Sequence, residues 1–479
     1  MLDRNEDRPI LVVDLDGTLI RSDMLYECFW SSFAQDWRTP LKALQGLAGG
    51  RAALKARLAD LAAPDPATLP YTPEVLEHIR DWRAAGGRTA LVTAADQRLA
   101  DGIARHLGLF DEVHGSDGKT NLKGSAKAAF VSRRYGDTGY IYAGDSAADV
   151  PVWQGACGAV TVGLSSGLRH RVDAMHPQKS THLAPPVSAL PATLKAMRPH
   201  QWLKNLLVFA PVMAAHSFQA GDLLQALVAF VAYSLVASSV YLLNDLLDLA
   251  SDRAHPRKCR RPLASGALPL VHGMVMVPVL LLGGAALALA LSPLFLGVLA
   301  GYYLLTIAYS LWLKRKPIVD ICTLAALYTL RIAAGAAATG IQLSIWLLAF
   351  SAFLFFALAA VKRQAELVDM RERGITAAPG RGYIVDDLSI VTQMATASGF
   401  VAVLVFMLYL NEPTVRALYS TPELLWGAGL ILMYWVSRMV LVAQRGRMDD
   451  DPVVFAARDR VSWIAFGIIG VLFVGASTL

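Results

Sequence analysis

Two patterns of apolar and polar positions divide this chain of 479 residues near residue 198. Before that point, short apolar runs alternate with longer amphipathic stretches. From Leu203 onward, apolar runs of about 17–25 residues follow one another, which is the length that a helix needs to span a bilayer. The pattern predicts a soluble domain over residues 1–185, a linker over 186–197 and a membrane domain over 198–479.

The short apolar runs predict the strands of a parallel sheet. They are rich in β-branched residues and lie at Ile10–Asp14, Thr89–Thr93, Gly139–Ala143 and Gly158–Val162. Helical patterns lie between them, at Glu74–Ala85, Gln97–Leu107 and Ser125–Tyr135. Because strands that alternate with helices are typical of parallel sheets, we expect a Rossmann-like α/β domain. In such a domain the chemistry lies at the carboxyl ends of the strands.

Acidic residues follow two of these strands. Asp14 and Asp16 follow the first strand, and Asp145 and Asp149 follow the third. One carboxylate of the first pair can attack phosphorus while the other transfers protons, and the second pair suits Mg²⁺, which prefers oxygen ligands. Thr93 and a lysine would bind phosphoryl oxygens. An isolated Asp-x-Asp pair is more often a turn or a helix cap, but blocks that follow successive strands in order favour a phosphoryl-transfer site.

The residues from Asp14 to Ile20, Asp-Leu-Asp-Gly-Thr-Leu-Ile, resemble the first motif of the haloacid dehalogenase superfamily of phosphatases, and later blocks match its other motifs over roughly residues 8–185. The resemblance implies that Asp14 is the nucleophile and Asp16 the general acid and base. It also implies a Mg²⁺ site, formed by Asp14, Asp16, Asp145 and Asp149.

The third motif of that family is a lysine. Lys123, within Asn-Leu-Lys-Gly, fits it best, and Lys119 and Lys127 are rivals. Thr93 matches the second motif. The long stretch between the first two motifs implies a small helical cap, which would choose the substrate.

The membrane domain is predicted to be an all-α bundle of nine transmembrane helices. The spans are expected near residues 205–220, 223–243, 268–290, 293–312, 318–338, 344–361, 388–410, 423–443 and 459–478. Lysines and arginines gather in every second connection, whereas the alternate loops contain Arg416 alone. By the positive-inside rule, the basic loops and the soluble domain are cytoplasmic. We therefore expect an integral protein of the bacterial inner cell membrane.

Composition and charge fit this division. The chain is 55% hydrophobic and 17% charged, which is less charge than a soluble protein carries. Residues 1–197 hold 22 of the 44 Lys+Arg and 22 of the 38 Asp+Glu, so the remaining 22 and 16 give the second part the whole net charge of +6.

The cations of the second part lie in loops rather than on one exposed basic face, so we expect no nucleic-acid binding. The four scattered cysteines predict neither disulfides nor a zinc site.

The loop after the second predicted span carries an acidic cluster. With a turn of about 100° per residue, Asn244, Asp245, Asp248 and Asp252 fall within about a 100° arc of one helix face. Three carboxylates beside the membrane repel one another, so we expect them to share Mg²⁺, which also binds substrate phosphates. The cations that follow would bind the same anion, and they are Lys258, Arg260 and Arg261.

A second polar cluster ends the sixth predicted span. Lys362 and Glu366 share a helix face, with Arg363 next to them in the chain, and an ordinary i,i+4 salt bridge is the alternative interpretation. Arg331, within the fifth span, requires an anion or an acidic partner. Lys204, at the entry to the first span, would bring a further cation to the same surface. Because both clusters end even-numbered spans, we expect them to face one cavity.

The motif from Asn244 to Asp252 and the nine predicted spans resemble the UbiA superfamily of intramembrane prenyltransferases. The second cluster departs from the usual second aspartate motif of that family and begins Lys-Arg-x-Ala-Glu instead. Together with Arg198-Pro-x-Gln-Trp-x-Lys204-Asn, it resembles one branch, the decaprenyl-phosphate phosphoribosyltransferases. That branch implies 5-phosphoribosyl 1-diphosphate as the donor and a polyprenyl phosphate as the acceptor.

This resemblance implies roles for both clusters. Asp245, Asp248 and Asp252 would hold the Mg²⁺ that neutralises the leaving diphosphate. The substrate-binding residues would be Lys204, Asn244, Lys258, Arg260, Arg261, Arg331, Lys362, Arg363 and Glu366. The attached phosphatase would then remove the 5-phosphate of the lipid product.

Two alternatives remain open. One is a conventional prenyltransferase, which moves a prenyl group from a prenyl diphosphate to an aromatic or other acceptor, beside an independent phosphatase. The other is a membrane-anchored phosphatase whose bundle is a lipid receptor or scaffold, which the aspartate motif disfavours. The sequence leaves open the length of the lipid and the oligomeric state, a homo-oligomer included.

Overall fold

The computed structural model describes residues 8–117, 121–137, 139–184, 189–376, 381–417, 419–448 and 451–478. Contacts divide the chain into two units. Unit 1 comprises Met1–Met197 and Tyr241–Val277, and unit 2 comprises Arg198–Val240 and Pro278–Leu479. One boundary between the units lies after Met197, and the segment Tyr241–Val277, here called the aspartate-rich segment, groups with the N-terminal part of the chain. The predicted domain limits stay a prediction.

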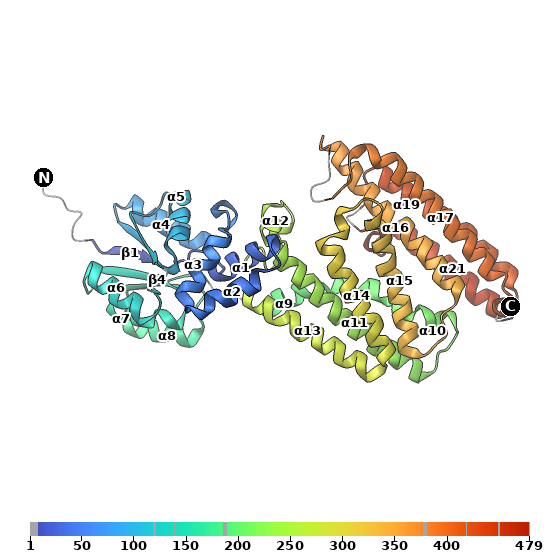
Figure 1. Cartoon of the computed structure of the whole chain (residues 1–479), viewed down its shortest axis with the longest axis horizontal. Coiled ribbons are helices and arrows are strands. Elements are labelled where there is room, and N and C mark those ends of the chain that lie inside the picture. Colours follow the sequence, from blue (N-terminus) through green and yellow to red (C-terminus); the bar gives the residue numbers. More distant parts are fainter. Residues whose placement is uncertain are drawn as a thin grey trace. The chain divides into compact units, whose positions relative to one another are not determined.

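A six-stranded parallel sheet forms the centre of unit 1, in the order β3-β2-β1-β4-β5-β6 (Figure 1). Its strands are β1 (Ile10–Val13), β2 (Thr89–Asp96), β3 (Glu112–Ser116), β4 (Tyr140–Gly144), β5 (Gly158–Val162) and β6 (Ser180–Ala184). The predicted α/β domain is thus confirmed. The two edge strands were not predicted, because their residues are largely polar and only half-buried, which gives no apolar run to detect.

Successive residues of β1 pack on opposite faces of the sheet. Leu11 and Val13 belong to one core cluster, and Ile10 and Val12 belong to the other. The first cluster includes residues of α4 (Pro73–Ala84) and α5 (Gln97–Leu107), and the second includes residues of α6 (Ser125–Tyr135), α7 (Val150–Gly155) and α8 (Ser166–Met175). Because helices cover both faces, β1 is buried along its whole length. This packing fixes the position of Asp14, the next residue.

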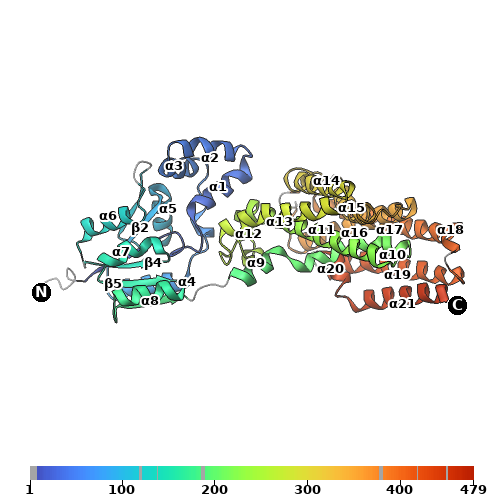
Figure 2. The ribbon, with the colours of Figure 1, turned by 90° about the horizontal axis from the view of Figure 1, so that it is seen from below.

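Three helices between β1 and β2 form the cap that the sequence implied. They are α1 (Met24–Gln35), α2 (Thr39–Ala48) and α3 (Arg51–Leu61), and they lie together in Figure 2. Asp23 begins α1, because its side chain accepts a hydrogen bond from the backbone N–H of Leu25. Cys28 and Leu58 anchor the cap in the core of the α/β domain.

The aspartate-rich segment begins at the end of α11 (Ala220–Leu247) and continues through α12 (Leu249–Ala254). The backbone N–H of Asp248 donates to Asn244 (2.8 Å), and that of Asp252 donates to Asp248 (2.8 Å). Helical hydrogen bonding therefore continues through the turn between the two helices. A short 3₁₀ turn, η4 (Lys258–Arg260), follows before α13 (Leu270–Leu291).

Within the described residues, eight helices are long and apolar enough to cross a membrane. They are α11, α13, α14 (Pro293–Leu311), α15 (Val319–Thr339), α16 (Ile345–Glu372), α17 (Leu388–Leu410, with the preceding 3₁₀ turn), α19 (Leu425–Gln444, with the preceding 3₁₀ turn) and α21 (Arg460–Thr478). Within unit 2, α16 packs against α15, α17 and α19. The chain is an integral membrane protein whose membrane domain is all-α, as predicted.

The first of the nine predicted spans, near 205–220, is not one α-helix. It consists of a 3₁₀ segment, η3 (Pro199–Phe209), and the five-residue α10 (Ala210–Ala214). Pro211 has no N–H to donate to the carbonyl four residues earlier, so a regular α-helix is interrupted there. Among the described residues the long apolar helices therefore number eight, close to the nine predicted spans, and η3 with α10 occupies the place of the first.

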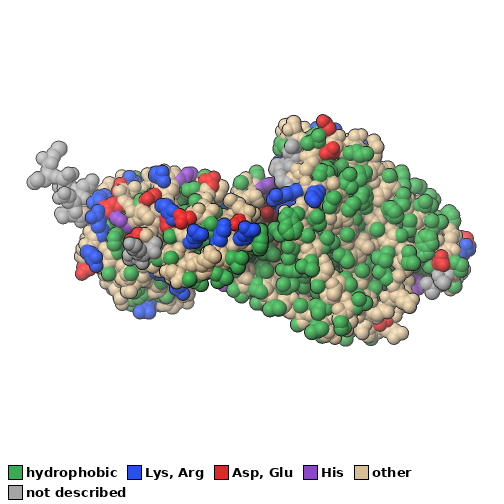
Figure 3. Space-filling model, viewed as in Figure 1, with side chains coloured by type: hydrophobic (Ala, Val, Ile, Leu, Met, Phe, Trp, Pro, Cys, Tyr) green, Lys and Arg blue, Asp and Glu red, His purple; other side chains and the backbone are tan. Residues whose placement is uncertain are grey.

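Hydrophobic side chains cover the visible face of the bundle (Figure 3). Leu282 is 68% exposed, Leu404 57% and Val471 72%. Such a large apolar surface is unfavourable in water but is expected where helices face lipid.

Candidate active sites

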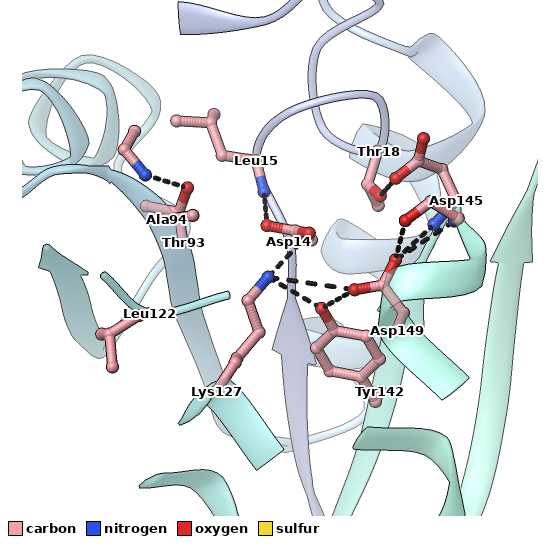
Figure 4. A network of polar contacts seen from close by, with 12 residues as sticks. Asp14, Leu15, Thr18, Thr93, Ala94, Leu122, Lys127, Tyr142, Asp145 and Asp149 are labelled. Atoms are coloured by element: carbon pink, nitrogen blue, oxygen red, sulfur yellow. Dashed lines mark hydrogen bonds and ion pairs between the residues drawn. The ribbon is translucent and has the colours of Figure 1, made fainter. Parts of the chain in front are cut away.

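Carboxylates meet at the carboxyl ends of β1 and β4 (Figure 4). Oxygen atoms of Asp14, Asp145 and Asp149 lie within 4.8 Å of one another, and no other such acidic group occurs among the described residues. This confirms that the two acidic motifs converge. Asp16 lies outside that group, and its carboxylate accepts a hydrogen bond from the backbone N–H of Met24 (2.8 Å). The proton-transfer and metal-binding roles expected of Asp16 stay predictions.

The lysine of this site is Lys127. Its Nζ lies 2.7 Å from Oδ2 of Asp14 and donates to the hydroxyl of Tyr142 (3.0 Å). Lys123, which the sequence favoured, is exposed, and Lys119 lies outside the described residues. Lys127 lies in the first turn of α6, which begins at Ser125, so its side chain points toward β1, whereas Lys123 precedes the helix. The preference for Lys123 is thus corrected.

Asp149 is held in place by its own loop. Its carboxylate accepts hydrogen bonds from the backbone N–H and the hydroxyl of Ser146 (3.1 and 3.0 Å) and from the hydroxyl of Tyr142 (2.8 Å). Asp145 accepts a hydrogen bond from the hydroxyl of Thr18 (3.3 Å). Most of these partners lie in the same strand and turn, so the turn after β4 presents two carboxylates toward Asp14 with little freedom.

Two glycines leave room for these carboxylates. A Cβ atom at Gly17 would lie 2.2 Å from Oδ2 of Asp145, and Gly17 also has a positive φ of 77°. A Cβ atom at Gly144 would lie 2.9 Å from Oδ2 of Asp149. Only glycine fits at the first position without displacing a carboxylate.

Burial controls the charge of this site. Desolvation, helped by the neighbouring Asp23, raises the pKa of Asp16 to about 8. Desolvation and the nearby Asp14 raise the pKa of Asp145 to about 7. Desolvation also raises the pKa of Asp14, although Lys127 opposes the shift. The raised pKa of Asp16 is the direction that suits a carboxyl group that donates a proton near neutral pH.

Two further polar residues border the site. Thr93 is fully buried in β2, and its hydroxyl accepts a hydrogen bond from the backbone N–H of Ala95 (3.0 Å). Lys55, from the cap helix α3, donates to the carbonyl of Ala94 (2.6 Å). Burial lowers the pKa of Lys55, and attraction to Asp16 opposes that shift. No sequence motif indicates Lys55, because its position depends on how the cap folds over the sheet.

Arg261 joins two residues of the aspartate-rich segment. Its Nη1 lies 3.1 Å from Oδ1 of Asp245 and also donates to Asp252. Both carboxylates are buried. Burial raises the pKa of Asp252, and Arg261 opposes that shift. Asp248 and Asn244 are half-buried.

The predicted direct cluster of three carboxylates is therefore, in this structure, a pair linked by an arginine. The other predicted cations of this segment, Lys258 and Arg260, are exposed.

In unit 2, Lys204 and Lys362 meet at Asp451. Lys204 donates to its carboxylate, and Nζ of Lys362 lies 3.7 Å away. Burial raises the pKa of Asp451, but the two lysines outweigh burial and hold the pKa below its usual range. Asp451 was not among the predicted site residues, although it is the last of three consecutive aspartates before Pro452. The two predicted lysines are thus brought together by an unexpected acid.

Arg363 has a different environment from the one predicted. It is fully buried, its Nη2 lies 2.6 Å from Oδ2 of Asp320, and it also pairs with Glu366. Tyr383 donates to the other oxygen of Asp320 (2.6 Å), and Nε of Arg381 lies 3.3 Å from Glu366. This network neutralises Arg363 inside the bundle, and the phosphate-binding role expected of Arg363 stays a prediction.

Arg331 is buried within α15. Its Nε donates to the side chain of Asn205 (2.9 Å), and its guanidinium lies 5.2–5.3 Å from the rings of Tyr233, Tyr302 and Tyr328. An amide and three aromatic rings thus provide much of the stabilisation that a buried cation requires. The expectation that the two polar clusters face one cavity stays a prediction, because they lie in different units.

These features define the class of protein: an α/β domain with a phosphatase-type carboxylate site, in one chain with a helical membrane bundle and an aspartate-rich segment. The sequence model of the UbiA prenyltransferase family matches residues 205–474. The chain belongs to that family. The sequence model of the haloacid dehalogenase-like hydrolases matches residues 11–154.

Several proteins are similar to this chain. The uncharacterized protein y4nM of Sinorhizobium fredii is 39% identical over 477 residues, which are 97% of this chain and 90% of the relative. The nodulation protein NoeC of Azorhizobium caulinodans is 38% identical over 287 residues, 58% of this chain and 92% of the relative. A decaprenyl-phosphate phosphoribosyltransferase of Mycobacterium tuberculosis is 39% identical over 188 residues, 38% of this chain and 62% of the relative.

Proposed function

We propose that this chain is a bifunctional membrane enzyme. Its bundle transfers 5-phosphoribose from 5-phosphoribosyl 1-diphosphate to a polyprenyl phosphate, and its α/β domain removes the 5-phosphate from the lipid product. The observation that carries the proposal is the presence of two carboxylate sites in one chain, the Asp14 site and the Asp245–Asp252 pair. The similarity to decaprenyl-phosphate phosphoribosyltransferases supports the choice of donor and acceptor.

The phosphatase step follows from the geometry around Asp14. A carboxylate oxygen of Asp14 attacks the phosphorus, and the bond to the sugar oxygen breaks. That oxygen takes the proton of Asp16, whose raised pKa keeps it available at neutral pH. Water then attacks the phosphorus of the aspartyl phosphate, its proton returns to Asp16, and inorganic phosphate leaves. Lys127 lies where it can bind a phosphoryl oxygen throughout.

The residues of this site fit Mg²⁺. Asp14, Asp145 and Asp149 offer carboxylate oxygens, the hard ligands that this ion prefers, and these converge within 4.8 Å. When bound, Mg²⁺ would neutralise phosphoryl charge as bonds change. The aspartate-rich segment offers the same type of ligand through Asp245, Asp248 and Asp252.

In the transfer step, an oxygen of the lipid phosphate attacks C1 of the ribose, and the bond to the diphosphate breaks. The diphosphate leaves with the electron pair, so stabilisation of its negative charge lowers the barrier. Arg261 is the cation best placed to contribute, because it already lies between Asp245 and Asp252. The attacking phosphate is anionic, so no general base is required.

Loss of the 5-phosphate would make the pair of reactions effectively irreversible, since the lipid product no longer carries that group. This order requires both sites on one side of the membrane. We propose the cytoplasmic side of the bacterial inner membrane, because the basic loops and the α/β domain would then share it.

Mass spectrometry of lipids tests the proposal. Purified protein is given 5-phosphoribosyl 1-diphosphate, Mg²⁺ and a polyprenyl phosphate. The expected product is polyprenyl-phosphoribose without a 5-phosphate, and the Asp14→Asn variant should accumulate the 5-phosphorylated form. If Asp14→Asn releases the same dephosphorylated product at the same rate, the α/β domain does not remove the 5-phosphate and the proposal is wrong.

A second candidate is transfer of a prenyl group from a prenyl diphosphate to an aromatic or other acceptor. The match to the UbiA prenyltransferase family favours it. Competition between phosphoribosyl diphosphate and prenyl diphosphate in the same membranes separates the two functions, because only the true donor is consumed with release of diphosphate.

A further inference from the structure

A buried ion pair joins the cap of the α/β domain to the aspartate-rich segment. Nη1 and Nη2 of Arg253, in α12, each lie 2.7 Å from a carboxylate oxygen of Glu27, in the cap helix α1. The exposed fractions of the two side chains are 5% and 1%. The hydroxyl of Ser22 also donates to Glu27. Two parallel hydrogen bonds between charged groups are a strong and directional contact.

The backbone of the same two segments approaches closely at a second point. Gly266 has a positive φ of 71°, and a Cβ atom there would lie 2.5 Å from both Cβ and the carbonyl oxygen of Arg21. A side chain at position 266 would therefore collide with the residue that precedes Ser22. Helices α1 and α12 also lie beside each other in Figures 1 and 2.

Arg253 connects its ion pair with Glu27 to the carboxylates of the aspartate-rich segment. Its Nε donates to the carbonyl of Ala264 (2.9 Å). The next residue, Ser265, donates from both its backbone N–H and its hydroxyl to the carbonyl of Arg261 (2.9 Å each). Arg261 in turn pairs with Asp245 and Asp252. Polar contacts, connected through the backbone of residues 261–265, thus run from Glu27 to the two buried aspartates.

Helix α1 also reaches the phosphatase site. The backbone N–H of Met24, its first residue, donates to Asp16 (2.8 Å), and Glu27 lies three residues later. One helix therefore contacts both the proton-transferring carboxylate of the α/β domain and the cation that supports the aspartate-rich segment.

We propose that Glu27 is a positioning residue for the aspartate-rich segment. It fixes Arg253, Arg253 fixes the turn at Ala264, and that turn holds Arg261 against Asp245 and Asp252. The α/β domain is then a structural part of the transferase, in addition to its own activity. The consequence for transfer rests on the proposed function, whereas the ordering of the segment does not.

The structural consequence is tested by hydrogen exchange of the full-length protein in detergent, followed by mass spectrometry. Glu27→Ala and Arg253→Ala should each raise exchange across residues 249–266, and the double variant should raise it no further. Glu27→Gln, which keeps a hydrogen-bonding side chain, should show a smaller increase. The matched control is Glu77→Ala, an exposed glutamate of α4. Unchanged exchange in the single variants, or additive effects in the double variant, would overturn the proposal.

The functional consequence is measured with the transfer assay. Partners that orient metal-binding carboxylates typically affect activity by about 10–100-fold, and we expect a loss of that size for Glu27→Ala and Arg253→Ala. Arg253→Ala leaves the buried Glu27 without its cation, so hydrolysis of a small phosphate ester by both variants is measured as well, to show that the α/β domain remains folded. If wild-type protein transfers nothing while exchange responds as expected, the proposed function fails and the ordering role stands. If wild-type protein transfers and both variants transfer equally well, the positioning role fails.

Discussion

Lys127 and Asp14 form a buried ion pair in which Nζ lies 2.7 Å from Oδ2. The same ammonium lies 4.0 Å from Asp149. One lysine therefore reaches two of the three converging carboxylates, and it lowers the cost of their mutual repulsion before any cation or phosphate arrives.

Replacement of the nucleophile separates the two proposed activities. Asp14→Asn should lower phosphatase activity by on the order of 10³-fold or more, because the covalent route is closed, and should leave transfer from phosphoribosyl diphosphate intact. The measurement is the ratio of 5-phosphorylated to dephosphorylated lipid. Asp137→Asn, at an exposed position after α6, is the matched control and should change neither form.

The two neighbouring lysines provide a direct comparison. Lys127→Ala should reduce phosphatase activity strongly, because Asp14 loses its buried cation, whereas Lys123→Ala should retain most of the activity, because that side chain is exposed. Hydrolysis of a small phosphate ester by each variant checks this. A larger loss of activity in Lys123→Ala than in Lys127→Ala would instead support Lys123, which the sequence favoured, as the lysine of the site.

Gly17 is expected to tolerate no side chain. Gly17→Ala places a Cβ atom 2.2 Å from Oδ2 of Asp145 in the undisturbed structure and is also strained by its positive φ. We expect weaker Mg²⁺ binding, seen as a higher Mg²⁺ concentration for half-maximal phosphatase activity. Gly167→Ala is a suitable control, because a Cβ atom there meets nothing within 4 Å.

The buried aspartates of the aspartate-rich segment should be required for transfer. Asp245→Asn and Asp252→Asn should each lower the rate of transfer by about 10–100-fold or more. Each variant loses the negative charge of a carboxylate that would bind Mg²⁺, together with its ion pair with Arg261. Asp222→Asn, at the opposite end of α11, is the control for a carboxylate on the same helix. Undiminished transfer in both test variants would remove this segment from the active site.

Asp451 gives a prediction about stability and pH. Its pKa is lowered in the folded protein by Lys362 and Lys204 against the effect of burial. Its ionised form therefore stabilises the fold above its ordinary pKa, and this contribution is lost as the pH falls through the folded pKa.

Asp451→Asn should cost about 1–3 kcal/mol near pH 6, and the difference from wild type should shrink as the pH approaches 3. Thermal unfolding in detergent at several pH values measures this. Asp369→Asn, which removes an exposed ion pair with Arg373, should change stability by less than about 0.5 kcal/mol at every pH. A constant difference between wild type and Asp451→Asn across the range would contradict the ionic explanation.

The features of the fold and of the site that depend on local sequence patterns could be predicted from the sequence. Asp14 and Asp145 each come directly after a buried apolar strand, so their convergence needed only the rule for parallel sheets. The eight long apolar helices of the described residues could be predicted from the length and composition of the apolar runs. The first predicted span, near 205–220, consists of η3 and α10 rather than one long helix, and apolar length alone does not distinguish these two arrangements.

The remaining relationships depend on tertiary structure. The choice between Lys123 and Lys127 depends on the residue at which α6 begins, and Gly124, with its positive φ, sets that point. Glu27 and Arg253 are 226 positions apart, so no periodicity in the sequence relates them. Arg363 was predicted to bind phosphate because it is a cation beside a membrane helix end, and its pairing with the buried Asp320 could not be predicted from the sequence.

The pairing of Glu27 with Arg253 has a consequence for the evolution of the gene. A split at the linker, near residue 190, would give one product with a buried glutamate lacking its cation and another with an arginine lacking its acid, and each uncompensated charge is destabilising. Replacement of the α/β domain by an unrelated phosphatase would meet the same penalty. Selection is therefore expected to keep the two halves of the gene together and to let positions 27 and 253 change only in concert.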